Sequence, residues 1–418
     1  MKQRIYIGEA SLNNLDIILQ EYSAKKVFLV RGKKSYELCG AQSRLNSILK
    51  KVGVQIFEFH DFEENPKIED LDRGLLQLRV YHPDLILAIG GGSVLDMAKL
   101  LKIEDLDRGL LQLRVYHPDL ILAIGGGSVL DMAKLLRFFY SYSGNKIGRV
   151  FEKIENLLPL IVIPTTAGTG SEATSFAVLY KNKVKYSVSH EDILPEIAFI
   201  DPYFTYNISR YLTACTGFDA LAQAIEAYWN LNATNESDVF AVKAIKLLWP
   251  NLPLAVNNPT KEVRNSMSEG AYWAGCAINI TKTTAPHAFS YPFTTYYGYP
   301  HGHAVALTFP FFMEYNVGSI LLKHGTVFDK MIRLMEILNI TNVNECKSLL
   351  CDYIENIGLD LKLPANFDHR IILSNINVQR LSNNPVRIDG AVANPVRIDG
   401  AVAKTALNTL CIKDDDKD

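Results

Sequence analysis

The chain has 418 residues, of which 48% are hydrophobic and 21% charged, and its formal net charge is -2. This composition predicts a globular protein large enough for two domains, and the near-neutral charge argues against nucleic-acid binding as its main function. The first residues, MKQRIYIGEASLNNL, contain no apolar signal segment, and no run of eighteen apolar residues occurs. We therefore expect no membrane span and a cytoplasmic location, and the six scattered cysteines, without a CxxC pair, are typical of reduced thiols.

Short apolar runs bounded by turn residues alternate with helical stretches in the first half of the chain. The predicted buried strands are KKVFLV (25–30), VQIFEF (54–59), PDLILAIG (83–90 and again 118–125), PLIVIP (159–164) and PEIAFID (195–201). Strands separated by helices predict a parallel sheet with helices on both faces. After DPYFT (201–205) only long amphipathic segments follow, so we expect an α/β domain over 1–205 and an all-helical domain over 206–418.

Two segments of the sequence occur twice, letter for letter. Residues 67–101 recur as 102–136, and NPVRIDGAVA at 384–393 recurs at 394–403. Solenoid repeats diverge and need several units to bury a continuous core. We therefore interpret these pairs as segments recorded twice, and each residue within them carries two numbers.

Two glycine-rich loops follow predicted strands. AIGGGSVLDMAK (88–99 and 123–134) runs from strand through glycines into a helix, where backbone N–H groups and the helix dipole favour a pyrophosphate. IPTTAGTGSEAT (163–174) follows the next strand, and ligands of open α/β sheets bind at such carboxyl ends. A plain glycine turn is the alternative, because GGGS lacks the GxGxxG spacing. The predicted cofactor residues of the first loop are Gly90, Gly91, Gly92, Ser93 and Asp96, or Gly125, Gly126, Gly127, Ser128 and Asp131 in the second copy.

Candidate metal ligands lie in two later segments. TGFDALAQAIEAYWN (216–230) places Asp219 and Gln223 four residues apart, on one face of a predicted helix. TAPHAFSYPFTTYYGYPHGHAVAL (284–307) contains His287, His301 and His303. A carboxylate with two or three imidazoles suits Fe(II) or Zn(II). The alternative is a polar helix rim with ordinary core histidines.

The ordered motifs GGGSVLDMAK, PTTAGTGSE, GFDALAQAIEAY and HAFSYPFTTYYGYPHG resemble the iron-containing (group III) alcohol dehydrogenases over essentially the whole chain. The resemblance implies a Rossmann-like N-terminal domain followed by a helical metal domain, an architecture shared with dehydroquinate synthase. It implies metal ligands at Asp219, Gln223, His287 and His301. It also implies dinucleotide contacts from the GGGS loop, Thr165, Thr166 and Lys185.

Two positions depart from the family pattern. Gln223 stands where the family has a histidine ligand, and Tyr291 stands where many members carry a further histidine. A glutamine oxygen can ligate, but it is neutral and hard, so metal affinity should fall. Alternatively the metal is lost and Asp219 orients the substrate. The stretch around Tyr291 is most similar to the hydroxyethylphosphonate dehydrogenase (phosphonoacetaldehyde reductase) branch.

The expected activity is that of an NAD(P)-dependent alcohol dehydrogenase acting as an aldehyde reductase, with phosphonoacetaldehyde as a candidate substrate. A metal would polarise the carbonyl, and Tyr291 or His303 would pass the proton. In VRGKKS (30–35) no acid is present to bind a ribose hydroxyl, and Arg31, Lys33 and Lys34 suit a 2′-phosphate unless they form a solvated loop. The alternatives are a dehydroquinate-synthase-type lyase and a nucleotide-binding pseudoenzyme that lost its metal. We expect a homodimer or a larger homo-oligomer.

Overall fold

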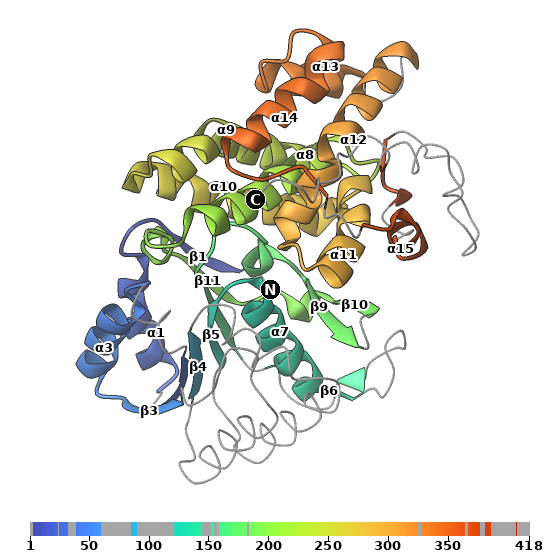
Figure 1. Ribbon diagram of the computed structural model, residues 1–418. Coiled ribbons are helices and arrows are strands. Elements are labelled where there is room, and N and C mark those ends of the chain that lie inside the picture. Colours follow the sequence, from blue (N-terminus) through green and yellow to red (C-terminus); the bar gives the residue numbers. More distant parts are fainter. Residues whose placement is uncertain are drawn as a thin grey trace. The chain divides into compact units, whose positions relative to one another are not determined.

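The computed structural model divides into two compact units, Met1–Thr166 with Gly170–Ile208, and Ala167–Thr169 with Ser209–Asp418 (Figure 1). Each unit is described by itself below. The structure describes residues 3–23, 25–31, 39–59, 85–89, 121–143, 152–153, 157, 159–181, 184–323, 328–363, 367–376, 381–385 and 407.

The first unit is built on a seven-stranded sheet with the order β1-β11-β8-β5-β4-β2-β3. Every neighbouring pair is parallel, which confirms the predicted parallel sheet. All the predicted strand segments form strands, whereas the edge strand β1 was not predicted, because RIYI is a short run with a charged start. The strands are β1 (Arg4–Ile7), β2 (Lys26–Arg31), β3 (Gln55–Phe59), β4 (Leu85–Ile89), β5 (Ile121–Gly125), β8 (Leu160–Pro164) and β11 (Ile197–Ile200).

The two copies of the duplicated strand sequence are neighbours in this sheet. β4 pairs with β5 so that Leu87 lies opposite Leu122 and Ala88 opposite Ala123, which are equivalent positions of the two copies. Only the second copy is described beyond its strand, where it continues into helix α7 (Gly127–Ser141). The first copy's Gly90, Gly91, Gly92, Ser93 and Asp96 lie outside the described residues.

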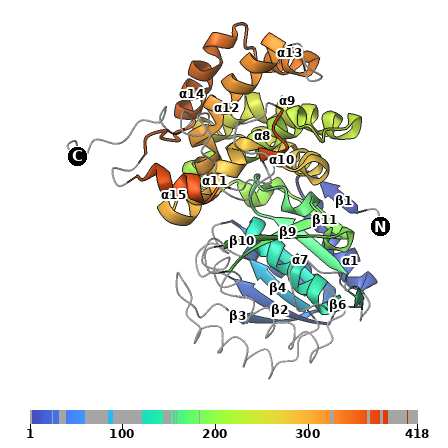
Figure 2. The same ribbon diagram turned by 90° about the vertical axis from the view of Figure 1, so that its right-hand side faces the viewer.

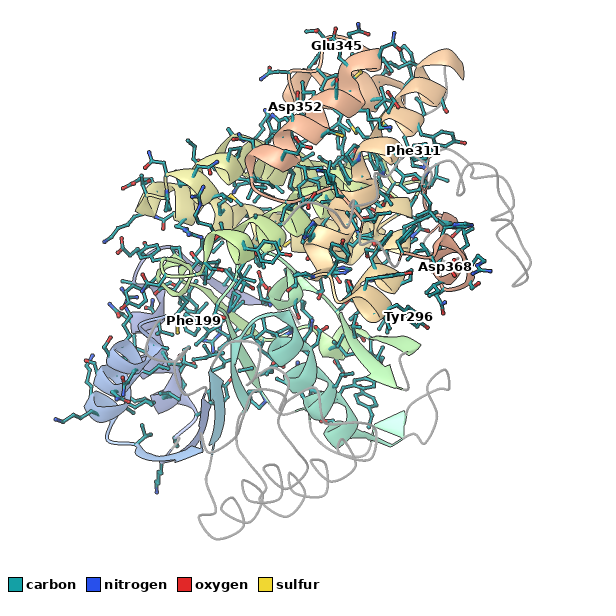
Figure 3. The ribbon with its side chains drawn as sticks, in the orientation of Figure 1. Phe199, Tyr296, Phe311, Glu345, Asp352 and Asp368 are labelled. Carbon is teal, nitrogen blue, oxygen red and sulfur yellow. The ribbon has the colours of Figure 1, made fainter. Side chains whose placement is uncertain are left out.

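Helices cover both faces of the sheet, as the alternation of strands and helices predicted. Helices α1 (Leu15–Glu21) and α3 (Ala41–Val52) pack through buried leucines and isoleucines against a face that includes Ile161, Ile163 and Phe199. Phe199 is labelled in Figure 3. Helix α7 contacts β5 and β8, and Figures 1 and 2 show it on the side of the sheet away from α1 and α3. Neighbouring strand residues point to opposite faces, so each strand contributes to both layers.

Smaller elements complete the first unit. An antiparallel hairpin of β9 (Phe176–Lys181) and β10 (Val184–Ser189) follows the second glycine-rich loop, and it was not predicted. Its alternating sequence, FAVLYK and VKYSVS, is the signal that could have revealed it. The remaining short elements are β6 (Tyr142–Ser143), β7 (Glu152–Lys153), η1 (Ser11–Asn14), η2 (Ser171–Ala173), η3 (Glu191–Ile193) and η4 (Pro202–Thr205).

The second unit is helical over its described residues, which confirms the predicted all-α region. Polar caps start its helices: Ser209 caps α8, Thr234 forms a capping box on α9, and Thr260 caps α10. The helices are α8 (Arg210–Trp229), α9 (Asn235–Asn257), α10 (Lys261–Thr281), α11 (Ala285–Tyr297), α12 (His301–Lys323), α13 (Phe328–Ile337), η5 (Val343–Glu345), α14 (Cys346–Asn356) and α15 (His369–Ser374).

Two of these helices, α9 and α12, are long and apolar enough to cross a membrane by length and composition alone. Core helices of water-soluble proteins meet the same criterion, so it is weak support for a membrane span. In α12, 67% of the apolar window is buried within the protein. Its apolar residues are therefore largely used in packing.

Candidate active site

Helix α8 carries the first part of the candidate site. Asp219, Gln223 and Glu226 are spaced four and three residues apart, so they share one face of the helix. All three side chains are buried, with residue exposures of 3%, 4% and 0%. Buried polar groups favour hydrogen-bond partners, and α11 supplies one, His287, to both Asp219 and Glu226.

Helices α11 and α12 bring two histidines to this face. His287 Nε2 lies 3.1 Å from Asp219 Oδ1, and His301 Nε2 lies 4.0 Å from the same oxygen. One ligand atom from each of these three residues lies within 4.8 Å of the other two. The structure thus brings together three of the four predicted ligands as a set of convergent donor atoms.

Gly302 explains how closely α12 approaches α8. A Cβ at this position would lie 1.8 Å from the carbonyl oxygen of Cys215 and 3.0 Å from Asp219 Cβ. No other residue fits without moving a backbone, because real Cβ contacts are never so short. The glycine between the histidines of HGH therefore allows His301 to reach the carboxylate.

Charge interactions reinforce the cluster. Burial opposes ionisation of Asp219, but the neighbouring His301 and His287 hold the pKa of its carboxyl below the ordinary value. Burial likewise disfavours a charged His287, yet Glu226 and Asp219 raise the pKa of its imidazole to about 9. The site is therefore built to hold positive charge between carboxylates.

Gln223, the fourth predicted ligand, has an unpaired acceptor. Its side-chain amide donates to Asp219, whereas its Oε1 is buried with no hydrogen-bond partner. An unpaired buried acceptor costs about 1–3 kcal/mol. This oxygen therefore has an open acceptor position, on a residue that bonds Asp219.

The two predicted proton-transfer residues have different surroundings. Tyr291 is 6% exposed and stacks on His301, with ring centroids 5.7 Å apart and an interplanar angle of 4°. His303 Nε2 lies 2.7 Å from the carbonyl oxygen of Asp360, which can only accept, so Nε2 carries a proton. His303 Nδ1 then accepts from the hydroxyl of Tyr211, 2.8 Å away. Tyr291 thus contacts a ligand of the cluster directly, and His303 is held between two protein groups.

The two glycine-rich loops begin side by side, at the carboxyl ends of β5 and β8. Gly125 is paired with Pro164 in the sheet, and the backbone N–H of Thr165 donates to the carbonyl of Gly125 over 3.0 Å. Gly126 is the N-cap of α7, and Gly127 begins the helix. This arrangement matches the predicted place for a nucleotide at adjacent strand ends.

Lys134 and Asp131, both on α7, fasten the second loop to the helix. The buried Lys134 Nζ donates to the carbonyls of Ser171 and Phe176 and to Thr174 Oγ1, over 2.7–2.9 Å. Asp131 accepts from Ser171 Oγ and from the backbone N–H of Val178. Asp131, a predicted cofactor residue, therefore has protein groups as its observed partners. Lys134, the last residue of the AIGGGSVLDMAK motif, was not predicted, yet it anchors the second loop.

Comparison with known proteins places the chain in a family. The family model described as "Iron-containing alcohol dehydrogenase" matches residues 2–104 and 101–202, and "Fe-containing alcohol dehydrogenase family, C-terminal" matches residues 213–389. This chain belongs to the iron-containing alcohol dehydrogenase family. The first model matches in two overlapping pieces, and their junction falls where the second copy of the duplicated segment begins.

Relatives agree with this placement. The alcohol dehydrogenase described here is 31% identical over 327 residues to Long-chain-alcohol dehydrogenase 1 of Geobacillus thermodenitrificans (strain NG80-2), covering 78% of this chain and 75% of the relative. It is 26% identical to the NADPH-dependent butanol dehydrogenase of Clostridium saccharobutylicum, covering 86% and 83%. The crystal structure of sulfoacetaldehyde reductase from Bifidobacterium kashiwanohense in complex with NAD+ is similar with a TM-score of 0.76 and 25% identity, covering 99% of this chain and 98% of that one. The chain is thus an NAD(P)-dependent oxidoreductase acting on CH–OH groups. The family models do not support the alternative of a dehydroquinate-synthase-type lyase.

The residues of the cluster fit the divalent metal that the family implies. Two imidazole nitrogens, a carboxylate oxygen and the unpaired Gln223 Oε1 form a donor set of the kind that binds Fe(II) or Zn(II). A satisfied polar cluster would leave no such oxygen. Several other predicted contacts cannot be placed: Lys33 and Lys34 lie outside the described residues, as do the side chains of Arg31, Ser128 and Lys185. Thr165 is 8% exposed and Thr166 partly exposed at the loop.

Proposed function

We propose that this iron-containing alcohol dehydrogenase reduces a small aldehyde that carries an acidic group, with phosphonoacetaldehyde giving 2-hydroxyethylphosphonate as the specific candidate. The single observation that carries the proposed reductase is the convergence of His287 and His301 on Asp219 beside the unpaired oxygen of Gln223. The acidic group is supported by the sequence around Tyr291 and by the likeness to a sulfoacetaldehyde reductase. A cytoplasmic homodimer or larger homo-oligomer remains our expectation.

Asp219, Gln223, His287 and His301 would hold the divalent metal. Bound there, the ion supplies a Lewis acid that polarises an aldehyde carbonyl. The protein fixes the donor atoms before binding, because both histidine rings are already packed in place: His287 is 3% exposed and His301 lies against Tyr291. Such preorganisation is what a polarising site requires.

The glycine loops and their anchors would hold the nucleotide. Gly125, Gly126 and Thr165 present backbone groups at one end of the sheet, and Lys134 with Asp131 keeps the second loop in place. When bound, the reduced nicotinamide supplies the hydride. Because VRGKKS offers cations and no acid, we expect NADPH to serve at least as well as NADH.

Reduction also requires a proton at the aldehyde oxygen. We assign its delivery to Tyr291, whose ring stacks on His301. His303 is the second candidate, because it accepts a hydrogen bond from Tyr211, a residue that is 46% exposed. A donor touching a metal ligand is better placed than one whose two nitrogens are bonded to protein.

The test is steady-state oxidation of NADPH and NADH by the full chain with phosphonoacetaldehyde, sulfoacetaldehyde, acetaldehyde and butanal. We expect the two acidic aldehydes to show kcat/KM at least tenfold above the neutral ones, since an anionic group adds charge-assisted contacts. Equal kcat/KM values for acidic and neutral aldehydes would contradict the preference for an acidic substrate, and the protein would then be a general aldehyde reductase. Absence of turnover with the whole panel, together with retained nucleotide binding, would support the pseudoenzyme. Tyr291→Phe should lower kcat more than KM, and His303→Asn is its matched comparison.

A further inference from the structure

We propose that Glu226 is a positioning residue: it fixes which nitrogen of His287 faces the metal and thereby sets the affinity of the centre. The inference rests on the proposed function, because it presupposes that Asp219, His287 and His301 hold an ion. Glu226 does not belong to the predicted ligand set; in the part of the chain that the structure describes, it hydrogen-bonds the ligand candidate His287 and the neighbouring Thr284.

The carboxylate of Glu226 is fully buried and uses both of its oxygens. Oε1 accepts a short hydrogen bond from His287 Nδ1. Oε2 accepts from the backbone N–H of Thr284 over 2.6 Å and from its hydroxyl over 2.7 Å. Each oxygen therefore has a donor, and the group has no freedom to rotate.

This contact determines which nitrogen of His287 keeps its proton when the other nitrogen binds a metal. A carboxylate only accepts, so the proton on His287 is held at Nδ1. The lone pair of a metal-binding imidazole is then left on Nε2, which is the nitrogen 3.1 Å from Asp219 Oδ1. A histidine without such a partner can present either nitrogen and can turn its ring, so part of the binding free energy would be lost.

The segment that presents Thr284 is itself held in place. Thr284 Oγ1 accepts from Trp229 Nε1 over 3.0 Å, and the carbonyl of Lys282 accepts from Asn230 Nδ2 over 3.2 Å. Lys282 has φ 63° and ψ -172°, a conformation that favours glycine. Strain of this kind persists only where surrounding contacts over-determine the backbone, and it recurs at functional sites. The contacts from the end of α8 thus fix Thr284 where its two donors meet Glu226.

A glutamine cannot replace Glu226 in this geometry. It has one acceptor oxygen, so its NH₂ group would face either the Thr284 donors or His287 Nδ1. The first orientation opposes donor to donor and leaves the N–H groups unpaired. The second requires His287 to give up its Nδ1 proton, which moves the proton to Nε2 and removes the lone pair that faces Asp219. Both outcomes weaken the metal site without changing the shape of the side chain.

The experiment compares the Zn²⁺ affinity of the full-length wild type with that of Glu226→Gln, by competition against a chromogenic chelator. We expect a 10- to 100-fold loss of affinity, the usual effect of removing the partner of a ligating histidine, with NADH binding unchanged. The matched control is Glu196→Gln, a carboxylate with an 18% exposed side chain, which pairs with Arg137 and accepts from Leu160 N in the first unit. It should lower thermal stability and leave Zn²⁺ affinity as in the wild type.

Thr284→Val keeps the charge of Glu226 and removes one hydrogen-bond donor to its Oε2. This variant therefore tests the inference if Glu226→Gln does not fold. We expect a severalfold loss of Zn²⁺ affinity in this variant. The inference would be overturned if the folded Glu226→Gln variant bound Zn²⁺ as tightly as the wild type, or if the Glu196 control lost as much affinity. If Glu226→Gln does not fold, wild-type affinity in Thr284→Val would overturn it. Each of these results would leave the proposed function standing. A wild type that binds no divalent metal would overturn the proposed metal centre and this inference with it.

Discussion

Each unit of the protein buries a polar cluster, and the two clusters differ in how completely their atoms are paired. On α7, Lys134 Nζ has several oxygen partners, and both oxygens of Asp131 accept hydrogen bonds. On α8, Gln223 Oε1 has no partner, and the Nε2 atoms of His287 and His301 converge on one carboxylate oxygen. The paired cluster fastens a loop, whereas the other leaves a buried oxygen without a hydrogen bond beside a pair of convergent imidazoles.

The physical reason is that burial makes polar atoms expensive unless they are bonded. A group with all its partners inside the protein stabilises the fold and has nothing left for a ligand. An acceptor left unpaired beside converging imidazoles loses about 1–3 kcal/mol until a ligand compensates it. Pairing, more than residue type, therefore distinguishes the anchor from the candidate metal centre.

The largest effect is expected when the unpaired cluster loses a ligand. His301→Ala should abolish metal binding and lower aldehyde reduction roughly a hundredfold to ten-thousandfold, because Lewis-acid polarisation supplies several kcal/mol. Nucleotide binding should persist, since His301 lies on α12 and the GGGS loop with Thr165 belongs to the first unit. Metal analysis, NADPH titration and turnover check this. Full turnover in the variant, or in exhaustively chelated wild type, would mean that the site works without an ion.

Breaking the paired cluster should instead affect stability. Lys134→Met leaves three loop oxygens without their donor and removes the buried cation 3.6 Å from Asp131 Oδ1, so we expect a loss of about 3–5 kcal/mol in the free energy of unfolding. Metal affinity should stay as in the wild type. The matched control is Lys51→Met, whose side chain is 73% exposed beside Asp16, where the loss should be below about 1 kcal/mol. Denaturant melts measure both; similar losses would show that the α7 cluster is no anchor.

A pH effect should arise beside the same anchor. Burial raises the pKa of Glu172 from 4.5 to about 7, so between these values the folded protein binds more protons than the unfolded chain. Stability contributed by the neutral carboxyl is complete below the unfolded pKa and is lost as pH rises through about 7. Glu172→Gln, which mimics the neutral form, should remove this decline and gain on the order of 2 kcal/mol at pH 8. Melts at pH 5 and pH 8 test it, and an unchanged difference between the two pH values would contradict it.

Completing the donor set should have a smaller effect in the opposite direction. Gln223→His restores the family's ligand, and we expect metal affinity to rise about tenfold, since a ligand change acts at least as strongly as a change in its partners. Competition against a chelator measures it, with Gln223→Leu as the control that removes the oxygen. Equal affinity in the wild type and in Gln223→Leu would show that Oε1 contributes no bond.

The smallest effect is expected from deleting residues 67–101, which removes one copy of the duplicated segment. β2 could then pair with β5 through the same residues that β4 now offers, because the two copies are identical. Stability, nucleotide binding and metal affinity should be maintained. If the 35-residue and the ten-residue segments were both recorded twice, the intact mass of the natural protein should lie about 5 kDa below 46.8 kDa. Loss of nucleotide binding on deletion would show that both copies are needed.

Much of the fold and of the ligand set follows from local pattern. Apolar runs of four to eight residues locate every strand of the seven-stranded sheet except β1, because strands that are buried on both faces need apolar side chains. The four-residue spacing of Asp219 and Gln223 places them on one helix face, as α8 shows. The sequence did not predict a role for Glu226, although it lies on the same helix face three residues after Gln223. It also did not predict a role for Lys134, although this residue ends the recognised AIGGGSVLDMAK motif. A lone acid or lysine in a helix carries no sequence signal for its partner.

The folded chain alone decides which of these groups meet. Residues 219, 287 and 301 lie on three different helices, and it is the packing of α11 and α12 on α8, permitted by Gly302, that brings their ligand atoms within 4.8 Å. The same packing decides that Glu226 is paired with His287 while Gln223 Oε1 is left without a partner. Periodicity is a short-range property of the backbone, so it can be read along the chain. Hydrogen-bond satisfaction is a property of three-dimensional neighbours, so it exists only once the helices have packed.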